Sequence, residues 1–415
     1  MRNAAHRAHR PPPATPLLAA LALTLALAGC GKSAPRQYGG GAGAHALATA
    51  PAHGALGVAT RNTTRLGGAD VVADAASVAH AAYPGLTAAT RPSVAVLVDR
   101  HYWQAALAAS VLASSPVGAP ILYSEGQRTP ASSEEALASM NPLGAPALGG
   151  AQVIRIGTSA PLPRGYLAHQ LAAGPPAAVA AAIASLLVEL DAGSTPQQAI
   201  VLSQAASPAM AMPAASLAAE SGAPILLVSP SGVPAATAAA LARLHHPTVY
   251  VVDAAALSRR TLHALRRLAA VKAIPSGTAA RSSLAEAAVQ NSIEVARYTN
   301  GDFGWGVKEP GHGLVFANAA RPLDAPAAAL LAATGDYGPL LLLSHATSVP
   351  PALASYLADI QPAYSDPQFP AVRGAYNHGW LIGDENAISA LTQAEIDSML
   401  EIVARTQASE EPEVE

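Results

Sequence analysis

The sequence has a single cysteine and few charged or aromatic residues. Because Cys30 is the only cysteine among 415 residues, no disulfide can form within the chain. Charged residues make up 12% and aromatic residues 4% of the chain, so its core must be built from Ala, Val, Leu and Ile. A net charge of -3 argues against a dedicated nucleic-acid-binding protein, which would be strongly basic. With 51% hydrophobic residues, the chain is expected to be globular.

The sequence also lacks the short motifs of common enzyme classes. It contains no Gly-x-Ser-x-Gly elbow, no Walker loop, no Gly-x-Gly-x-x-Gly after a strand and no His-Glu-x-x-His helix. Asp99 and His101 could form a catalytic pair, but no nucleophile is associated with them. We therefore expect neither catalysis nor a bound cofactor or metal.

The first thirty residues predict export and lipid attachment. Arg2, Arg7 and Arg10 form a basic start, and residues 17–28 form an apolar run that is short for a transmembrane span. Leu-Ala-Gly then precedes Cys30, which is the order of a bacterial lipobox. We expect residues 1–29 to be a lipoprotein signal peptide and Cys30 to carry the lipid that holds the protein at the membrane. The alternative is an ordinary secretory signal in which the cysteine is incidental.

Low-complexity segments flank the rest of the chain. Residues 30–60 are rich in Gly, Ala and Pro and have no hydrophobic periodicity, which is typical of a flexible tether. Residues 403–415 form an acidic tail.

One segment occurs three times, as GAPILYSEG at 118–126, GAPILLVSPSG at 222–232 and YGPLLLLSHATSVP at 337–350. The spacing of roughly a hundred residues is that of a domain and not of a solenoid repeat. Other apolar runs accompany each copy, at 94–99, 199–204 and 313–318 before it and at 151–157, 248–253 and 378–383 after it. Since Ala-rich helical segments separate these runs, they predict an α/β fold of three similar modules, each with a mainly parallel central sheet flanked by helices.

The repeated strand is followed each time by a polar loop and a proline. Ser124, Ser229 and Ser344 close the strand, and a proline opens the next helix at 130, 234 and 350. Helix N-termini at the carboxyl end of a parallel sheet offer free N–H groups to anions, so these loops are candidate binding sites. The alternative is that Ser and Pro only shape the turn.

Several segments resemble the cell wall binding repeat 2 modules of Gram-positive surface proteins. They are TTRLGGADVVADAASVAHAAYP (63–84), VAVLVD (94–99), ALAASVLASSPVGAPILYSEG (106–126) and GWLIGDENAIS (379–389). The resemblance implies three modules packed as a pseudo-threefold trimer, which hold a protein on the cell envelope by noncovalent binding to anionic cell-wall polymer. On this basis we assign the modules to residues 61–169, 170–272 and 273–402.

Two motifs of that family are incomplete here. The opening Arg-Leu-Gly-Gly-Ala-Asp stands at Arg65–Asp70 but reads QLAAGP at 170–175 and AIPSGT at 273–278. The acidic position of the first helix is Ala105 in the first module, Met210 in the second and Asp324 in the third. Arg65, Asp70 and Asp324 are therefore candidate polymer-binding residues, and the second and third modules are degenerate.

The segment LSRRTLHALRRLAAVK at 257–272 is basic, and its positively charged side chains could bind an anionic polymer. On a helix, Arg259 and Arg266 would share one face and the leucines another. The planar guanidinium group of arginine can donate two parallel hydrogen bonds to a phosphate group. The alternative is a solvated helix face without a ligand.

A second function remains open, because a lipid-anchored α/β protein could be the solute-binding receptor of a transporter. Such a receptor would consist of two lobes joined by hinge strands, whereas this sequence shows three serial units of similar length.

The membrane anchor can be tested by replacing Cys30 with Ser and fractionating cells. We expect the wild-type protein in the membrane fraction and the Cys30→Ser protein released from it, because a serine hydroxyl cannot accept the thioether-linked lipid. Retention of the variant at the membrane would contradict the anchor.

Overall fold

The computed structural model describes residues 56–171, 173–191, 195–276, 283–333, 338–364 and 376–404. All of them belong to one compact unit that spans Thr49–Glu415. The predicted signal peptide, Cys30, most of the predicted tether and almost all of the predicted acidic tail lie outside the described residues, and the end of the predicted tether forms a strand, Leu56–Ala59. In the described part of the chain, no helix is both long and apolar enough to cross a membrane.

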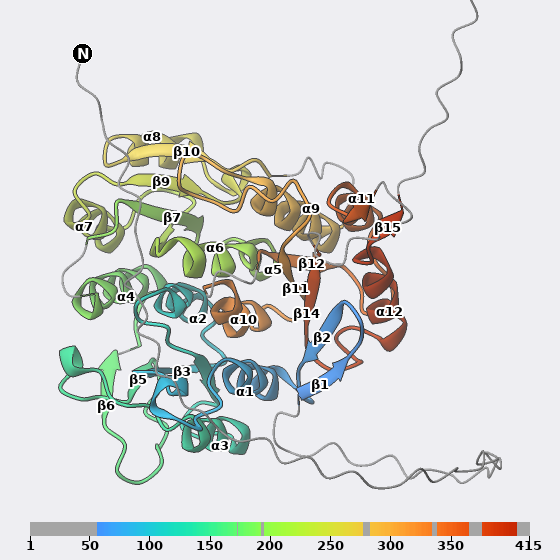
Figure 1. The fold of residues 1–415 in the computed structure, drawn as a ribbon. Coiled ribbons are helices and arrows are strands. Elements are labelled where there is room, and N and C mark those ends of the chain that lie inside the picture. The colour runs from blue at the N-terminus through green and yellow to red at the C-terminus, as the bar shows by residue number, and fades with distance from the viewer. Residues whose placement is uncertain are drawn as a thin grey trace, which may run out of the picture. The chain divides into compact units, whose positions relative to one another are not determined.

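Each repeat forms a parallel sheet with the same strand order (Figure 1). The first sheet runs β4 (Ile121–Ser124), β3 (Ala95–Asp99), β5 (Val153–Ile156), β6 (Ala168–Leu171). The second runs β8 (Ile225–Val228), β7 (Gln198–Ser203), β9 (Thr248–Val251), β10 (Ala270–Ala273). The third runs β12 (Leu340–Leu343), β11 (Gly313–Asn318), β14 (His378–Ile382), β2 (Thr63–Leu66), with β1 (Leu56–Ala59) antiparallel at its edge. The predicted α/β fold with three similar modules is confirmed.

Helices of three kinds accompany each sheet. In the first, second and third modules in turn, the helix before the first strand is α1 (Val71–Ala82), α4 (Pro176–Leu190) and α9 (Leu284–Arg297). In the same order, the first strand is followed by α2 (Trp103–Ala109), by α5 and α6 (Pro208–Ala211, Pro213–Ser221), and by α10 (Asp324–Ala332). The helix after the second strand is α3 (Ala131–Met140), α7 (Ala235–Arg243) or α11 (Pro351–Asp359). Two further helices, α8 (Arg259–Arg266) and α12 (Ala390–Met399), follow the third strand of the second and third sheets, and β13 (Ala363–Tyr364) pairs with β15 (Val403–Ala404).

The helices after the first strands pack on one another at the centre of the unit. The 3-10 turn Ser110–Ala113, which continues α2, contacts α6 and α10, and α6 contacts α10. Their buried faces consist mainly of alanine, including Ala106, Ala109, Ala215, Ala218 and Ala328. Small side chains let three helix backbones approach closely, which explains why so much of this core is alanine.

The helices before the first strands link neighbouring modules in a cyclic pattern. Helix α1 packs on β4 and α3 of its own module and on α10 of the third, and α4 packs on β8 and α7 and on α2 of the first. Likewise, α9 packs on β12 and α11 and on α5 and α6 of the second. Each module therefore contacts the other two through equivalent helices, as a pseudo-threefold arrangement requires.

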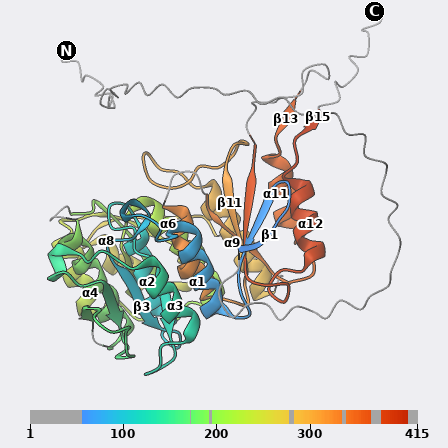
Figure 2. The same ribbon diagram turned by 60° about the horizontal axis from the view of Figure 1, so that its bottom comes forward.

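The N-terminal strand closes this ring. Strand β2 pairs with β14, so an N-terminal strand completes the third sheet, and Figures 1 and 2 show the blue hairpin β1–β2 beside the orange and red strands. Strands β6 and β10 occupy the same edge position in the first and second sheets. A Cβ on Gly67, which follows β2, would lie 2.5 Å from the carbonyl carbon of Gly383. Only glycine permits this close approach between the two ends of the fold.

Replacing Gly67 with Ala should therefore destabilise the protein. We expect the free energy of unfolding in urea to fall by about 1–3 kcal/mol, because the new methyl group meets backbone that cannot rotate away. Gly232→Ala is the matched control, since a Cβ there has no neighbour within 4 Å and the residue has no positive φ. Equal stability of the two variants would show that the closing contact carries no such constraint.

Candidate polymer-binding surfaces

The loops after the repeated strands lie at the carboxyl ends of the sheets and share one geometry. In the first and second modules a tight turn is closed by two backbone hydrogen bonds, between Glu125 and Arg128 and between Ser229 and Gly232. His345 and Ser348 form the corresponding bridge in the third. Each loop ends at a proline that is the N-cap of the next helix: Pro130 for α3, Pro234 for α7 and Pro350 for α11.

The three serines of these loops are not equivalent. Ser124 pairs with Asp99 as the last residue of β4, and the residues in the same register are Val228 and Leu343. Ser229 and Ser344 lie one residue further along. Ser124 is fully buried, whereas the other two are partly exposed. An external ligand can reach Ser229 and Ser344 but not Ser124.

In the second module, α8 begins beside the Ser229 loop. The hydroxyl of Thr261, in the first turn of α8, donates to the carbonyl oxygen of Pro230 over 3.1 Å. Ser258 caps the same helix by accepting from the backbone N–H of Thr261 at 3.1 Å. The Thr261 hydroxyl also lies 3.3 Å from the Ser229 carbonyl oxygen, so the Ser229 loop packs against the first turn of α8, which begins at Arg259. Arg266 lies about 10 Å further along the helix axis than Arg259.

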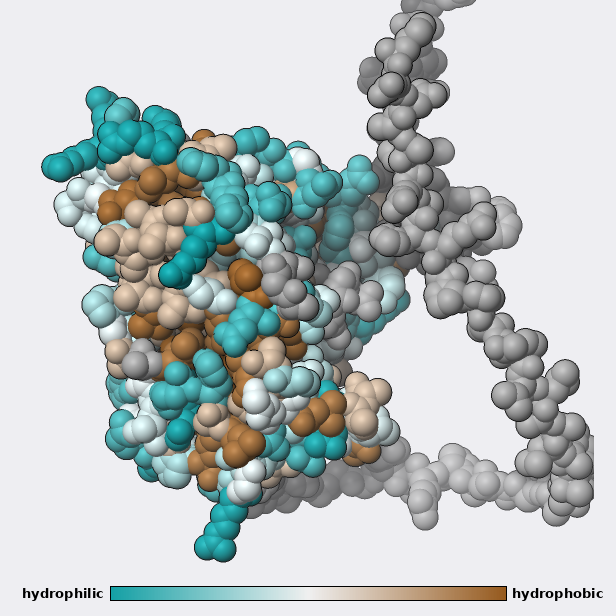
Figure 3. Space-filling view, turned by 90° about the vertical axis from the view of Figure 1, so that its left-hand side faces the viewer, coloured by the Kyte–Doolittle hydropathy of each residue, from teal (hydrophilic) through white to brown (hydrophobic). Residues whose placement is uncertain are grey.

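Helix α8 presents a basic surface. Leu265 is buried beneath it, and its cationic residues are all exposed: Arg259, Arg260, His263, Arg266 and Arg267. The sequence has no acidic residue between Asp253 and Glu286. Among the described residues, none pairs with Arg259, Arg260 or Arg266 through an ion pair or hydrogen bond. Figure 3 shows hydrophilic residues at the top of the face, where α8 lies in Figure 1.

The other two sheet edges carry different charges. In the first module Glu125 pairs with Arg100 at 3.3 Å and also with Arg128, and His101 Nδ1 lies 3.0 Å from Asp99 Oδ1. The third module places Asp384 and the exposed Glu385 beside its strand ends. The second module has Asp253 after its third strand, as the third module has Asp384, but α8 and its C-cap add four exposed arginines, so this edge is positively charged overall.

Arg65 is held inside the third module. It is 6% exposed and donates to the carbonyl oxygens of Gly383 (2.9 Å), Asp384 (2.8 Å) and Ile388 (2.7 Å), and also to Gln393 Oε1. With its donors engaged in this way, the guanidinium is not presented to an external polymer. It fixes the loop after β14 to the N-terminal strand.

Asp70 is exposed and caps α1. Its Oδ1 accepts from the backbone N–H groups of Val72 at 2.9 Å and Ala73 at 3.0 Å. This arrangement satisfies two N–H groups that the helix leaves free. A ligand would have to compete with the cap.

Asp324 belongs to a buried charge cluster that the sequence did not reveal. Arg321 Nε lies 2.8 Å from Asp324 Oδ2, and Arg321 also pairs with Asp74 of α1. Both carboxyls are fully buried. Burial raises the pKa of Asp74 to about 6, although Arg321 and the Gly68 N–H favour its charged form. Burial and the neighbouring Asp74 raise the pKa of Asp324 well above its usual value.

The structure therefore separates the candidate residues into three groups. Ser229, Arg259 and Arg266 share one surface of the second module. Arg65, Asp70 and Asp324 lie where the first and third modules meet, and the remaining serines lie on other sheet edges. No group of three or more His, Cys, Asp or Glu side chains that could hold a metal ion occurs in the described segments.

Comparison with solved structures relates the fold to known proteins. This chain resembles two clostridial proteins in fold. Cwp6 from Clostridium difficile superposes with a TM-score of 0.61 at 18% identity, over 82% of this chain and 48% of that chain. Cwp8 from Clostridium difficile gives a TM-score of 0.59 at 15% identity, over 82% of this chain and 52% of its own. The chain thus spans about half the length of each. The sequence matches no family profile and no curated protein.

The buried cluster predicts a pH-dependent effect of Asp324→Asn. Because both folded-state pKa values are raised, the folded protein binds more protons than the unfolded chain. Its free energy of unfolding therefore loses the contribution of Asp74 as the pH rises from about 4 to about 6, and that of Asp324 from about pH 4 up to its own raised pKa. Asn mimics the protonated carboxyl and avoids the second loss, so the variant should gain stability relative to wild type as the pH rises above about 4, by at most about 1.4 kcal/mol per pH unit.

Urea unfolding at several pH values measures this difference. Asp302→Asn, at an exposed aspartate, is the control and should show no comparable trend. A raised pKa at Asp324 would be ruled out if the difference in free energy of unfolding between Asp324→Asn and wild type did not change with pH. It would also be ruled out if the variant became less stable relative to wild type as the pH rose.

Proposed function

We propose that this protein binds an anionic polymer of the bacterial cell wall without a covalent bond. The observation that carries the proposal is the ring of three α/β modules, which agrees with the sequence resemblance to cell wall binding repeat 2 modules. The fold likeness to Cwp6 and Cwp8 supports it. We further propose that a lipid on Cys30 anchors the chain, so that the protein is a membrane lipoprotein of the cell envelope.

The second-module edge is the proposed contact for the polymer. It combines the partly exposed Ser229 loop with the basic surface of α8, and no acidic residue lies between Asp253 and Glu286 to oppose an anion. Arginine donates two parallel hydrogen bonds to phosphate or carboxylate. One such site binds weakly, so useful affinity would come from several contacts along one repeating polymer.

The proposed anchor and polymer contact together would bridge membrane and wall. If residues 30–55, the part of the predicted tether that precedes β1, are flexible, their r.m.s. reach would be roughly 30 Å, enough for the folded unit to leave the membrane surface. The receptor alternative is less well supported, because a ring of three similar sheets does not provide two lobes that close on a solute.

A pull-down with purified walls tests the polymer proposal. The chain without its lipid should sediment with intact walls, and much less with walls from which anionic polymers have been stripped chemically. Binding should weaken as salt is added, because exposed charges are screened beyond about 10 Å at 0.1 M ionic strength. Equal retention on intact and stripped walls would refute the polymer as ligand.

Charge reversal locates the contact. The double variant Arg259→Glu/Arg266→Glu should lose most binding to intact walls, at least about tenfold, since hydrogen bonds to charged groups contribute about 1.5–3 kcal/mol each. The matched control is Arg164→Glu/Lys308→Glu, which reverses two exposed cations outside α8. If both double variants weaken binding equally, only net charge matters and the assignment to α8 is wrong.

A further inference from the structure

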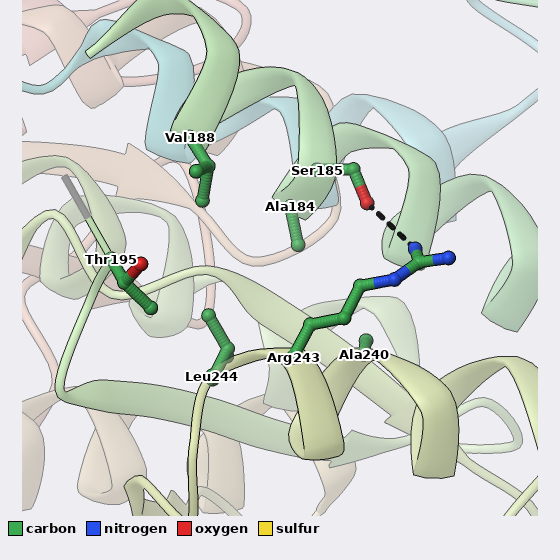
Figure 4. A pocket seen from close by; sticks show the side chains of 7 residues that line it. All are labelled: Ala184, Ser185, Val188, Thr195, Ala240, Arg243 and Leu244. Atoms are coloured by element: carbon green, nitrogen blue, oxygen red, sulfur yellow. Dashed lines mark hydrogen bonds between the residues drawn. The ribbon is translucent and has the colours of Figure 1, made fainter. Parts of the chain in front are cut away.

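A pocket opens between the two helices that cover the outer face of the second sheet. It has a volume of about 220 Å³ and lies between α4 and α7, at the C-terminal end of α7, whereas the Ser229 loop leads into the N-terminal end of that helix (Figure 4). Its apolar lining is small, consisting of Ala184 and Val188 on α4 and Ala240 and Leu244 on the α7 side. The volume is below the roughly 300–1,000 Å³ of sites for drug-sized ligands, so a small molecule is the fitting occupant.

The third module fills the corresponding space with an aromatic ring. Counted from the N-cap prolines Pro234 and Pro350, Ala240 of α7 and Tyr356 of α11 are both the sixth residue. Tyr356 is 1% exposed, and its hydroxyl donates to the carbonyl oxygen of Val307 at 3.0 Å. The guanidinium carbon of Arg297 lies 4.9 Å from the centre of the ring. In the third module, the Tyr356 ring therefore packs beneath the Arg297 guanidinium between α9 and α11.

The first module also supplies a tyrosine, from the opposite helix. Counted from the N-cap residues Asp70 and Pro175, Tyr83 at the end of α1 corresponds to Val188 of α4. The hydroxyl of Tyr83 donates to the carbonyl oxygen of Gly118 at 2.7 Å. In the second module neither helix provides an aromatic side chain at these positions.

Polar groups are placed at the rim of the pocket. Arg243 extends across it, and its Nη1 lies 3.2 Å from Ser185 Oγ (Figure 4). Arg243 has no acidic partner among the described residues, and the Thr195 side chain also borders the pocket. The residue nine positions after the N-cap is Arg243 here and Asp359 in the third module, so the charge at this place is reversed.

We propose that this pocket binds a compact aromatic carboxylate. The ring would occupy the space that Tyr356 fills in the third module, against Ala184, Ala240 and Leu244. The carboxylate would accept hydrogen bonds from Arg243 and Ser185 at the rim. An arginine over or beside the ring adds a cation–π attraction. This ligand site lies outside the proposed wall contact and does not depend on it.

Titration of the intact soluble chain with benzoate tests the proposal, with calorimetry and methyl NMR signals of Val188 and Leu244 as readouts. We expect saturable binding with a dissociation constant of about 1 mM or below. Acetate, which lacks the ring, and benzyl alcohol, which lacks the charge, should each bind at least about tenfold more weakly. Equal binding of either one, or no saturable binding of benzoate, would overturn the proposed ligand class.

Two variants locate the site. Ala240→Tyr should recreate the packing of the third module and abolish benzoate binding, and its melting temperature should be equal to or higher than that of wild type. Ala239→Tyr, at an exposed position on the same helix, is the control and should bind benzoate like wild type. Arg243→Gln should weaken benzoate at least about tenfold while leaving benzyl alcohol unchanged. Wild-type benzoate binding by a folded Ala240→Tyr variant, or by Arg243→Gln, would place the ligand elsewhere and refute the inference.

Discussion

The mutual packing of the three helices that follow the first strands is the interaction on which the rest of the structure depends. These helices contact one another, and each also contacts the second strand of a neighbouring module: α2 packs on β8, α6 on β12 and α10 on β4. A bulky side chain at the centre would separate the sheets, so alanine fills it at Ala109, Ala218 and Ala328. The low aromatic and charged content follows from this requirement, because helices buried on nearly all sides leave little surface for polar residues.

The ring has three equivalent contacts between modules, and among the described residues only the contact of the third module with the first contains a buried cluster of charged side chains. Asp324 and Arg321 meet Asp74 where the third module joins the first, whereas the acidic position is Ala105 or Met210 elsewhere. At the contact of the second and third modules, Asn291 donates to the carbonyl oxygen of Met210 at 2.8 Å. The charged contact lies beside the N-terminal strand, where Arg65 also ties the two ends of the fold together. Buried ion pairs add less stability than apolar packing but specify one partner, which suits the contact that closes the ring.

Strand prediction succeeded where apolar runs were long, as in β3, β7 and β11, and failed at the fourth strand of each sheet. Strands β2, β6 and β10 have four residues each, and β6 and β10 consist of half-exposed or exposed side chains that show no hydrophobic pattern. The sequence placed Arg65 at the start of the first module, but pairing with β14 is a contact across more than 300 residues that no local pattern encodes. Similarly, Ser124 is the last residue of its strand whereas Ser229 lies one residue beyond the end of its strand, and this difference depends on strand pairing that the sequence does not show. The charge cluster around Arg321 forms only where the first and third modules pack together, so it could not be predicted from one module's sequence.

The three modules show that one backbone arrangement tolerates different chemistry at its surface. The core must fit a shared centre, so its residue types vary little, whereas the sheet edges face solvent and differ in charge. The first edge pairs its own charges, the third is acidic and the second is basic through α8. An anionic polymer that met all three edges would be attracted by one and repelled by another. A polymer bound by this chain would therefore run along the second module and leave the third free, so binding by this protein need not follow the symmetry of its fold.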